Sequence, residues 1–241
     1  MVKESADWHR ELKTEGYLVG AADNFFAQGL TEGNAWRQFA DSWNDMPVDQ
    51  YMADGGRYRH RRYAEFRLLP QRNEIEELTN TTYRQSRKDN YLNGGIDRSY
   101  SSIAPEVKRN LAFREVLGRC RAVLDPEAEG AGRSWLVQVF QNRIYARTQE
   151  LGKPTPEGMH RDGVDYVLTL FIGRRNVTGG ESSTHCGTSG DVLSRVTLEQ
   201  PGEFIFLDDR RLKHAVEPIA PADASSSGHR DVLIAMFTEQ P

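Results

Sequence analysis

A series of short runs rich in β-branched and aromatic residues fills the second half of the chain and constrains its fold most strongly. Clusters of Gly, Pro, Asn and Ser separate the runs, a spacing that is typical of antiparallel strands joined by turns. Such strands predict a sandwich or a jelly-roll barrel, in which a metal or ligand lies in the mouth between two sheets. The runs are Trp135–Tyr145, Tyr166–Ile172, Val192–Leu198, Glu203–Leu207 and Asp231–Thr238.

Helical patterns dominate the first part of the chain. Residues 5–15 and 31–43 carry apolar side chains at helical spacing, and short strands are predicted at 16–20 and 57–69. A longer helix is predicted from Pro105 to Leu124, because proline is favoured in a first helical turn and apolar residues recur on one face after it. The order of these elements favours an α+β fold.

The length of the chain fits one domain. A chain of 241 residues with 38% hydrophobic residues can bury a substantial core without splitting. We expect a single domain over residues 1–241. Residues 1–130 are predicted to form mainly a helical cap with flanking strands, and residues 131–241 a cupin-like jelly-roll core with a metal site.

Charge and cysteine content limit the classes of partner. The 31 Lys and Arg residues nearly balance the 35 Asp and Glu residues, which disfavours nucleic acid or an anionic membrane surface and leaves a small molecule as the expected partner. No apolar stretch predicts a leader or a membrane span. Cys120 and Cys186 form neither a disulfide framework nor a zinc motif. We therefore expect a soluble, cytoplasmic protein; the oligomeric state stays open.

Two histidines and one carboxylate predict the metal. His160 and Asp162 are separated by one residue, so on an extended segment their side chains point to the same side, and His214 follows a later strand-like run. Two imidazoles and one carboxylate on one face of a metal are typical of non-haem iron(II) oxygenases, since the opposite face stays open for co-substrate and dioxygen. The alternative is a surface His beside a surface Asp, because about one residue in seven is acidic.

The flanking sequence favours the metal site. The pair His160-Arg161-Asp162 lies between a Pro- and Gly-rich turn and a β run, and Arg230 stands at the head of the last strand, sixteen residues after His214. A guanidinium there suits the bidentate binding of a dicarboxylate. The alternative for Arg230 is an ordinary edge-strand arginine.

Four blocks in order resemble the 2-oxoglutarate- and iron-dependent dioxygenase family that includes bacterial isoleucine hydroxylases. The resemblance covers about residue 135 to the end, with a weaker similarity at Arg57–Phe66. The blocks are Pro156-Glu-Gly-Met-His-Arg-Asp-Gly163, Arg175-Asn-Val-Thr-Gly-Gly-Glu-Ser182, Leu207-Asp-Asp-Arg-Arg-Leu-Lys-His214 and Gly228-His-Arg-Asp-Val-Leu233.

The resemblance implies a double-stranded β-helix, a cupin-like jelly roll, with N-terminal helical elements packed against it. It implies that His160, Asp162 and His214 bind Fe(II) and that Arg230 holds the distal carboxylate of 2-oxoglutarate, with O2 as the other co-substrate. Related halogenating enzymes carry a small residue in place of the carboxylate, so Asp162 favours hydroxylation.

A free amino acid as substrate would need a cation for its carboxylate and an acceptor for its ammonium group. Arg143, Arg59 and Arg61 are candidates for the first, and Glu181, after two glycines, is a candidate for the second. The alternative for each is a solvated charge or a structural ion pair.

The leading hypothesis is an Fe(II)- and 2-oxoglutarate-dependent oxygenase that hydroxylates an unactivated C–H bond of a small, aliphatic free L-amino acid. One alternative is desaturation or ring closure on an amino acid or a tailored secondary metabolite. Another is a catalytically silent, cupin-like binding protein. The sequence leaves the substrate, the carbon attacked, the stereochemistry and the lid over the site undetermined.

Overall fold

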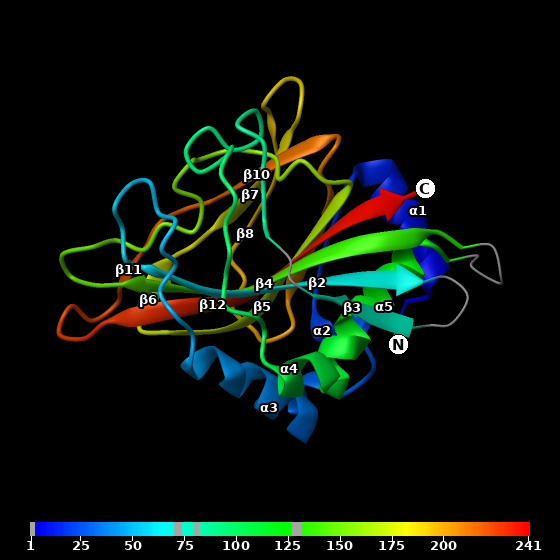
Figure 1. Cartoon of the computed structure of the whole chain (residues 1–241), viewed down its shortest axis with the longest axis horizontal. Helices are drawn as coiled ribbons and strands as arrows, with labels where there is room; N and C mark the ends of the chain where they lie inside the picture. The colour runs from blue at the N-terminus through cyan, green and yellow to red at the C-terminus, as the bar shows by residue number, and fades with distance from the viewer. Residues whose placement is uncertain (1–2, 70–73, 80–81, 127–131) are drawn as a thin grey trace.

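A seven-stranded antiparallel sheet forms the centre of the computed structural model (Figure 1), which describes residues 3–69, 74–79, 82–126 and 132–241. The two longest strands pair along their whole length, and strands from both ends of the chain join the same sheet. The strands in spatial order are β1 (Tyr17–Gly20), β9 (Phe204–Asp208), β5 (Tyr166–Arg175), β12 (Gly228–Gln240), β4 (Ser134–Ala146), β2 (Arg59–Leu69) and β3 (Glu74–Leu78).

Two smaller sheets complete the β structure. One contains β10 (Leu212–Val216), β7 (Ser182–Cys186) and β8 (Val192–Val196), and the other pairs β11 (Ile219–Pro221) with β6 (Val177–Gly179). Leu212 of the three-stranded sheet packs in one buried cluster with Phe171 and Ile205 of the large sheet. The three-stranded sheet therefore covers one face of the large sheet.

The helices gather on the opposite face of the large sheet (Figure 1). Phe39, Phe113 and Leu117 from the helices pack there with Val137 and Val139 of β4. The helices are α1 (Ser5–Glu15), α2 (Ala22–Phe25), α3 (Asn34–Asp41), α4 (Pro105–Arg109) and α5 (Leu111–Leu124), with short 3-10 turns at Leu30–Glu32 and Ser42–Asn44.

Alternation along the strands produces the two faces. In β12, Leu233 and Phe237 belong to the core beneath the helices, whereas Val232 and Met236 belong to the cluster beneath the three-stranded sheet. Successive side chains of a strand point to opposite faces, so a strand covered on both sides is apolar at almost every position. This pattern explains why the strongest β runs of the sequence lie in this sheet.

The prediction of one helix from Pro105 to Leu124 is wrong in one respect, because the segment forms two helices, α4 and α5. Asn110 interrupts it with an extended backbone (φ −63°, ψ 135°), and its Oδ1 accepts hydrogen bonds from the backbone N–H groups of Ala112 and Phe113 at 2.8 and 3.3 Å. An asparagine that caps a helix in this way satisfies N–H groups that have no partner within the helix.

The five predicted β runs of the second half are confirmed as β4, β5, β8, β9 and β12, each to within a few residues. The sequence did not predict β3, β6, β7, β10 or β11. The boundary expected near residue 130 lies outside the described residues. The strands β1 and β2 from the N-terminal part are hydrogen-bonded to β9 and β4 of the later part.

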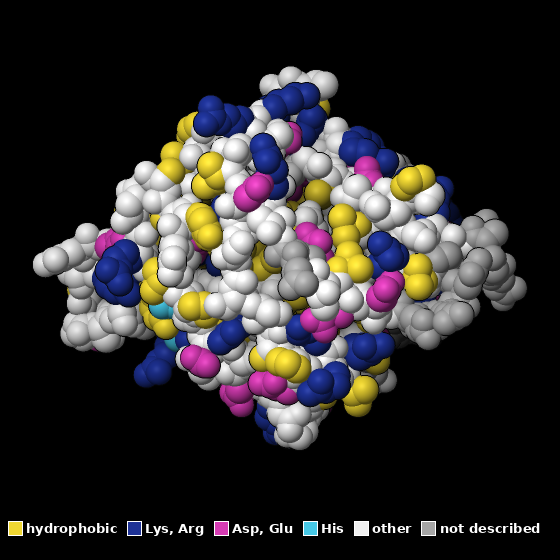
Figure 2. Space-filling view, viewed as in Figure 1, with side chains coloured by type: hydrophobic (Ala, Val, Ile, Leu, Met, Phe, Trp, Pro, Cys, Tyr) yellow, Lys and Arg dark blue, Asp and Glu magenta, His cyan; other side chains and the backbone are white. Residues whose placement is uncertain are grey.

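The surface seen in Figure 2 carries Lys and Arg side chains interspersed with Asp and Glu, in line with the nearly balanced formal charge. Within the described residues, no helix has both the length and the apolar character needed to cross a lipid bilayer.

Candidate metal centre and substrate cavity

The structure brings His160, Asp162 and His214 together although their sequence positions span more than fifty residues. One potential ligand atom from each lies within 4.8 Å of the others. His160 precedes β5 and forms a two-way backbone bridge with His214 of β10, with both N···O distances 3.0 Å. The Nε2 atoms of the two histidines lie 3.7 and 3.5 Å from the carboxylate oxygens of Asp162. Such a donor set suits iron(II).

Hydrogen bonding sets the histidine tautomer that a metal needs. The Nδ1 of His160 lies 2.9 Å from the carbonyl oxygen of Gly158, to which it donates, so that Nε2 is left to face Asp162 and a metal. Burial and the charge of His160 lower the pKa of His214 to about 4, which keeps His214 neutral. Burial favours neutral His160, but Asp162 and Glu157 raise the pKa of His160 to about 9, so metal binding would displace a proton from it.

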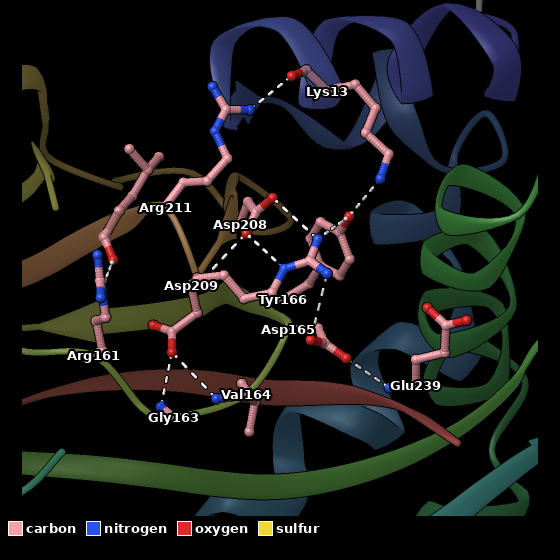
Figure 3. Close-up of polar contacts among 12 residues, drawn as sticks. Lys13, Arg161, Gly163, Val164, Asp165, Tyr166, Asp208, Asp209, Arg211 and Glu239 are labelled. Carbon is pink, nitrogen blue, oxygen red and sulfur yellow. Dashed lines mark hydrogen bonds and ion pairs between the residues drawn. The ribbon is translucent and has the colours of Figure 1, made fainter. Parts of the chain in front are cut away.

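Asp209 anchors the loop that carries Asp162 (Figure 3). Its carboxylate accepts hydrogen bonds from the backbone N–H groups of Asp162, Gly163 and Val164, at 3.1, 2.8 and 3.3 Å. Burial and the nearby charge of Asp162 raise the pKa of Asp209 above its usual range. The Oδ1 atom also lies 4.0 Å from Nδ1 of His214. Asp209 therefore fixes the backbone of the loop that carries Asp162 and lies near His214, whose Nδ1 has no hydrogen-bond partner among the described residues.

Helix α1 holds the turn between β9 and β10 in place (Figure 3). Arg211 in this turn donates to the carbonyl oxygens of Lys13 and Thr14, at 2.7 and 3.3 Å, and the Lys13 ammonium group donates to the Tyr166 hydroxyl at 3.0 Å. The Arg211 contacts connect the C-terminal end of α1 to the residue before β10, and the Lys13 contact connects it to the start of β5. They fix the position from which His214 projects.

A cavity of about 70 Å³ lies beside the three side chains, and its wall is unusually rich in buried charge. Besides His160, Asp162 and His214, its lining comprises Arg59, Arg61, Tyr83, Gln85, Asn90, Arg98, Phe140, Asn142, Pro154, Thr155, Glu157, Ile234 and Met236.

Two of the predicted substrate-binding residues, Arg59 and Arg61, lie on this wall. Both project from β2 and share one counter-ion, Asp49, at 2.8 and 3.4 Å. Among the described residues, NH2 of Arg59 has no hydrogen-bond partner, whereas Nε of Arg61 is the atom that lies 3.4 Å from Asp49. The guanidinium of Arg61 also stacks 4.7 Å from the centre of the Phe140 ring. Arg59 therefore keeps one donor available for an anionic group.

The segment 83–98 closes another side of the cavity. Tyr83 and Arg98 pair through two backbone hydrogen bonds, and Gln85 donates to the backbone and side-chain oxygens of Asp162 at 3.1 and 3.3 Å. Arg98 is 2% exposed, and its Nε and NH2 have no hydrogen-bond partner within the described part of the chain. Sequence reasoning missed these residues because the segment has no regular pattern.

Arg230 is buried on the face of β12 that also carries Ile234 and Met236 of the cavity wall. Its Nε and NH2 have no hydrogen-bond partner among the described residues. Burial and the neighbouring Arg174 lower its pKa to about 10. An unpaired buried guanidinium is costly, and a carboxylate is the group that would satisfy it.

The other two predicted substrate-binding residues do not line the cavity. Arg143 projects from the opposite face of β4 and forms a two-pronged ion pair with Asp231, both contacts 2.8 Å. Glu181 is 40% exposed and pairs with Arg195 at 2.7 Å. For both residues the structure supports the alternative, a structural ion pair.

Comparison with known proteins identifies the family. The family model described as 2OG-Fe dioxygenase matches residues 40–236, which is most of the chain and begins well upstream of the motif blocks. The chain therefore belongs to the 2OG-Fe dioxygenase family, whose members are enzymes that use Fe(II), 2-oxoglutarate and O2.

Two relatives are distant in sequence but cover nearly the whole chain. The chain is 27% identical to the 3(1)-hydroxy-L-isoleucine 4-dioxygenase of Pantoea ananatis over 96% of its length and 95% of that protein. It is 20% identical to the L-isoleucine-4-hydroxylase of Bacillus thuringiensis, over 95% and 92%. A match to the bifunctional enzyme flvA of Aspergillus flavus, 26% identical over 64% of this chain, spans only 21% of that longer protein.

Among solved structures, a BsmA homologue from Methylobium petroleophilum PM1 is 30% identical and superimposes with a TM-score of 0.85. The superposition covers 99% of this chain and 94% of that chain.

Proposed function

We propose that this enzyme hydroxylates an unactivated C–H bond of a small, aliphatic free L-amino acid, with release of succinate and CO2. The observation that carries the proposal is the cluster of His160, Asp162 and His214 on a cavity lined by buried cations. The two relatives named for isoleucine or hydroxyisoleucine support the amino acid class. On this proposal, the two facing sheets correspond to a double-stranded β-helix.

The residues of the cluster fit Fe(II). His160 and His214 each offer Nε2 and Asp162 offers a carboxylate oxygen, so three donors come from one side and the opposite side stays open. Bound iron would supply the redox chemistry in which 2-oxoglutarate loses CO2 and the two atoms of O2 are divided between succinate and the substrate.

The chain itself performs the positioning. Arg230 would bind the distal carboxylate of 2-oxoglutarate through Nε and NH2, the two guanidinium nitrogen atoms that lack partners among the described residues. Arg59 and Arg61, which both pair with Asp49, would add positive charge to the wall beside a bound substrate, while Phe140 and Met236 on the same wall would give apolar contacts to its side chain. Since the reacting bond is selected by orientation, small displacements of these groups should change the product.

The test is succinate formation by iron-reconstituted protein with 2-oxoglutarate and O2, against a panel of free L-amino acids. We expect strong stimulation by one aliphatic amino acid and a product heavier by one oxygen atom. The variant His160→Ala should lose this activity, and full activity in it would refute the metal assignment.

The mass of the product separates the remaining reactions. A loss of two hydrogens would indicate desaturation or ring closure in place of hydroxylation. Slow succinate formation that no amino acid stimulates would move the search to larger metabolites, and an absence of both iron and 2-oxoglutarate binding would favour a binding protein.

A further inference from the structure

Arg98 is a buried cation of the cavity wall without an ionic partner. Arg59 and Arg61 share Asp49, but no ion pair to Arg98 is found within the described residues. The Arg98 guanidinium stacks 4.7 Å from the Tyr83 ring centre, and its Nε and NH2 are buried without hydrogen-bond partners. A buried guanidinium in this state is suited to binding an anion that enters the cavity.

Glu157 is a buried carboxylate on the same cavity wall as Arg98. Its side chain is 8% exposed, and its Oε2 has no hydrogen-bond partner in the described part of the chain. Its Oε1 lies 3.4 Å from Nε2 of His160. The buried Oε2 atom of Glu157 can therefore accept a hydrogen bond from a cationic group that enters the cavity.

We propose that Arg98 and Glu157 form a two-point receptor for a zwitterionic α-amino acid, in which Arg98 binds the carboxylate and Glu157 binds the ammonium group. The inference rests on the proposed function and deepens it, since it names the groups that select a free amino acid. An amino acid has both charges on one carbon, so it satisfies both side chains at once. A simple carboxylic acid or amine satisfies only one.

The experiment measures binding to the full chain loaded with Mn(II) and 2-oxoglutarate, by calorimetry. The probes are the L-amino acid that best stimulates succinate formation, its α-carboxamide and its deaminated acid. Arg98→Met should weaken binding of the amino acid by about 10- to 100-fold and leave the carboxamide nearly unaffected, because that probe has no carboxylate. Arg98→Lys should restore part of the loss.

Glu157→Gln should weaken binding of the amino acid to a similar degree and leave the deaminated acid nearly unaffected. Arg84→Met and Glu181→Gln serve as matched controls, since both residues form exposed ion pairs, with Asp97 and Arg195. Neither control should change the affinity. Bound Mn(II) and thermal unfolding are measured for every variant.

Four outcomes would overturn the receptor. Equal weakening of all probes by Arg98→Met would assign Arg98 a structural role, and loss of Mn(II) from Glu157→Gln would assign Glu157 to the metal. Unchanged affinity of the amino acid in both variants would remove the receptor while leaving the proposed function intact. If no amino acid binds the unmodified protein, the proposed function fails together with the receptor.

Discussion

The two faces of the large sheet differ in whether their buried charged side chains are paired. On the helix side, Arg143 of β4 and Asp231 of β12 stand opposite each other and pair completely, through two contacts of 2.8 Å. On the cavity side, the neighbouring Arg230 is equally buried, yet its Nε and NH2 have no partner among the described residues. Adjacent residues of one strand face opposite ways, so β12 contributes to both environments.

This difference separates structural charges from ligand-binding charges. In a buried ion pair the two charges satisfy one another, so the pair contributes to the fold and leaves no charge for a ligand. A buried guanidinium with free donors, such as Arg230 or Arg98, leaves the folded state incompletely satisfied until an anion binds. Substitutions on the helix side should therefore change stability, and substitutions on the cavity side should change ligand binding.

The largest effect is expected at the metal. His214→Ala removes one of three ligands, so metal binding should be lost and succinate formation should fall by on the order of 1,000-fold or more. Metal content and initial rates provide the measurement. His185→Ala is the control, because its ring hydrogen-bonds to Gly190 and Ser183 and lies outside the cluster. Retained metal in His214→Ala would contradict the triad.

The ion pair on the helix side should dominate stability. Arg143→Met leaves Asp231 buried without its partner, so the free energy of unfolding should fall by about 3–5 kcal/mol. Denaturant unfolding measures this change. The concentration of 2-oxoglutarate at half-maximal rate should stay the same in the folded fraction, and a large increase in it would break the distinction between the two faces.

Arg230→Met should have the opposite profile. Loss of the proposed contact between Arg230 and 2-oxoglutarate should cost about 2–5 kcal/mol of binding, which raises the half-saturating concentration by about 30-fold or more. Stability should change little, because the guanidinium leaves no protein group unpaired. The exposed neighbour Arg175 gives the control variant Arg175→Met. An unchanged requirement for 2-oxoglutarate would show that another group holds this carboxylate.

The smallest effect is expected at Asp209, which supports the site without entering the ligand set. In the unmodified protein the Asp209 carboxylate accepts hydrogen bonds from the backbone N–H groups of residues 162–164. Asp209→Asn replaces one carboxylate oxygen by an NH2 group, which cannot accept them. The loop that carries Asp162 is then held less firmly, so metal affinity should fall by about 10- to 100-fold. Metal titration with Mn(II) measures the affinity, and the exposed Asp191→Asn variant is the control. An affinity equal to that of the control would assign Asp209 to the fold alone.

The sequence predicted strands correctly where the local pattern of apolar residues follows from burial. β5, β9 and β12 are covered on both faces, so their residues are continuously apolar and visible in the sequence. Sequence reasoning missed β7 (Ser182–Cys186), which consists of small and polar residues, and β10 (Leu212–Val216), which mixes polar and apolar residues and is mostly only partly buried. The strand that carries His214 was therefore not predicted, although the histidine was.

The sequence by itself predicted five strands of the second half, helices near the N-terminus, and His160, Asp162 and His214 as one group, because these depend on periodicity and on residue types. The role of Arg230 stays a prediction. Only the tertiary structure decided which arginines reach the cavity. Arg143 and Arg59 lie on strands of similar pattern. Arg143 pairs with Asp231 on the helix side of the sheet, whereas Arg59 on β2 lies in the cavity beside the three potential metal ligands. Partner choice depends on strand order and register between distant segments, which a local pattern does not encode.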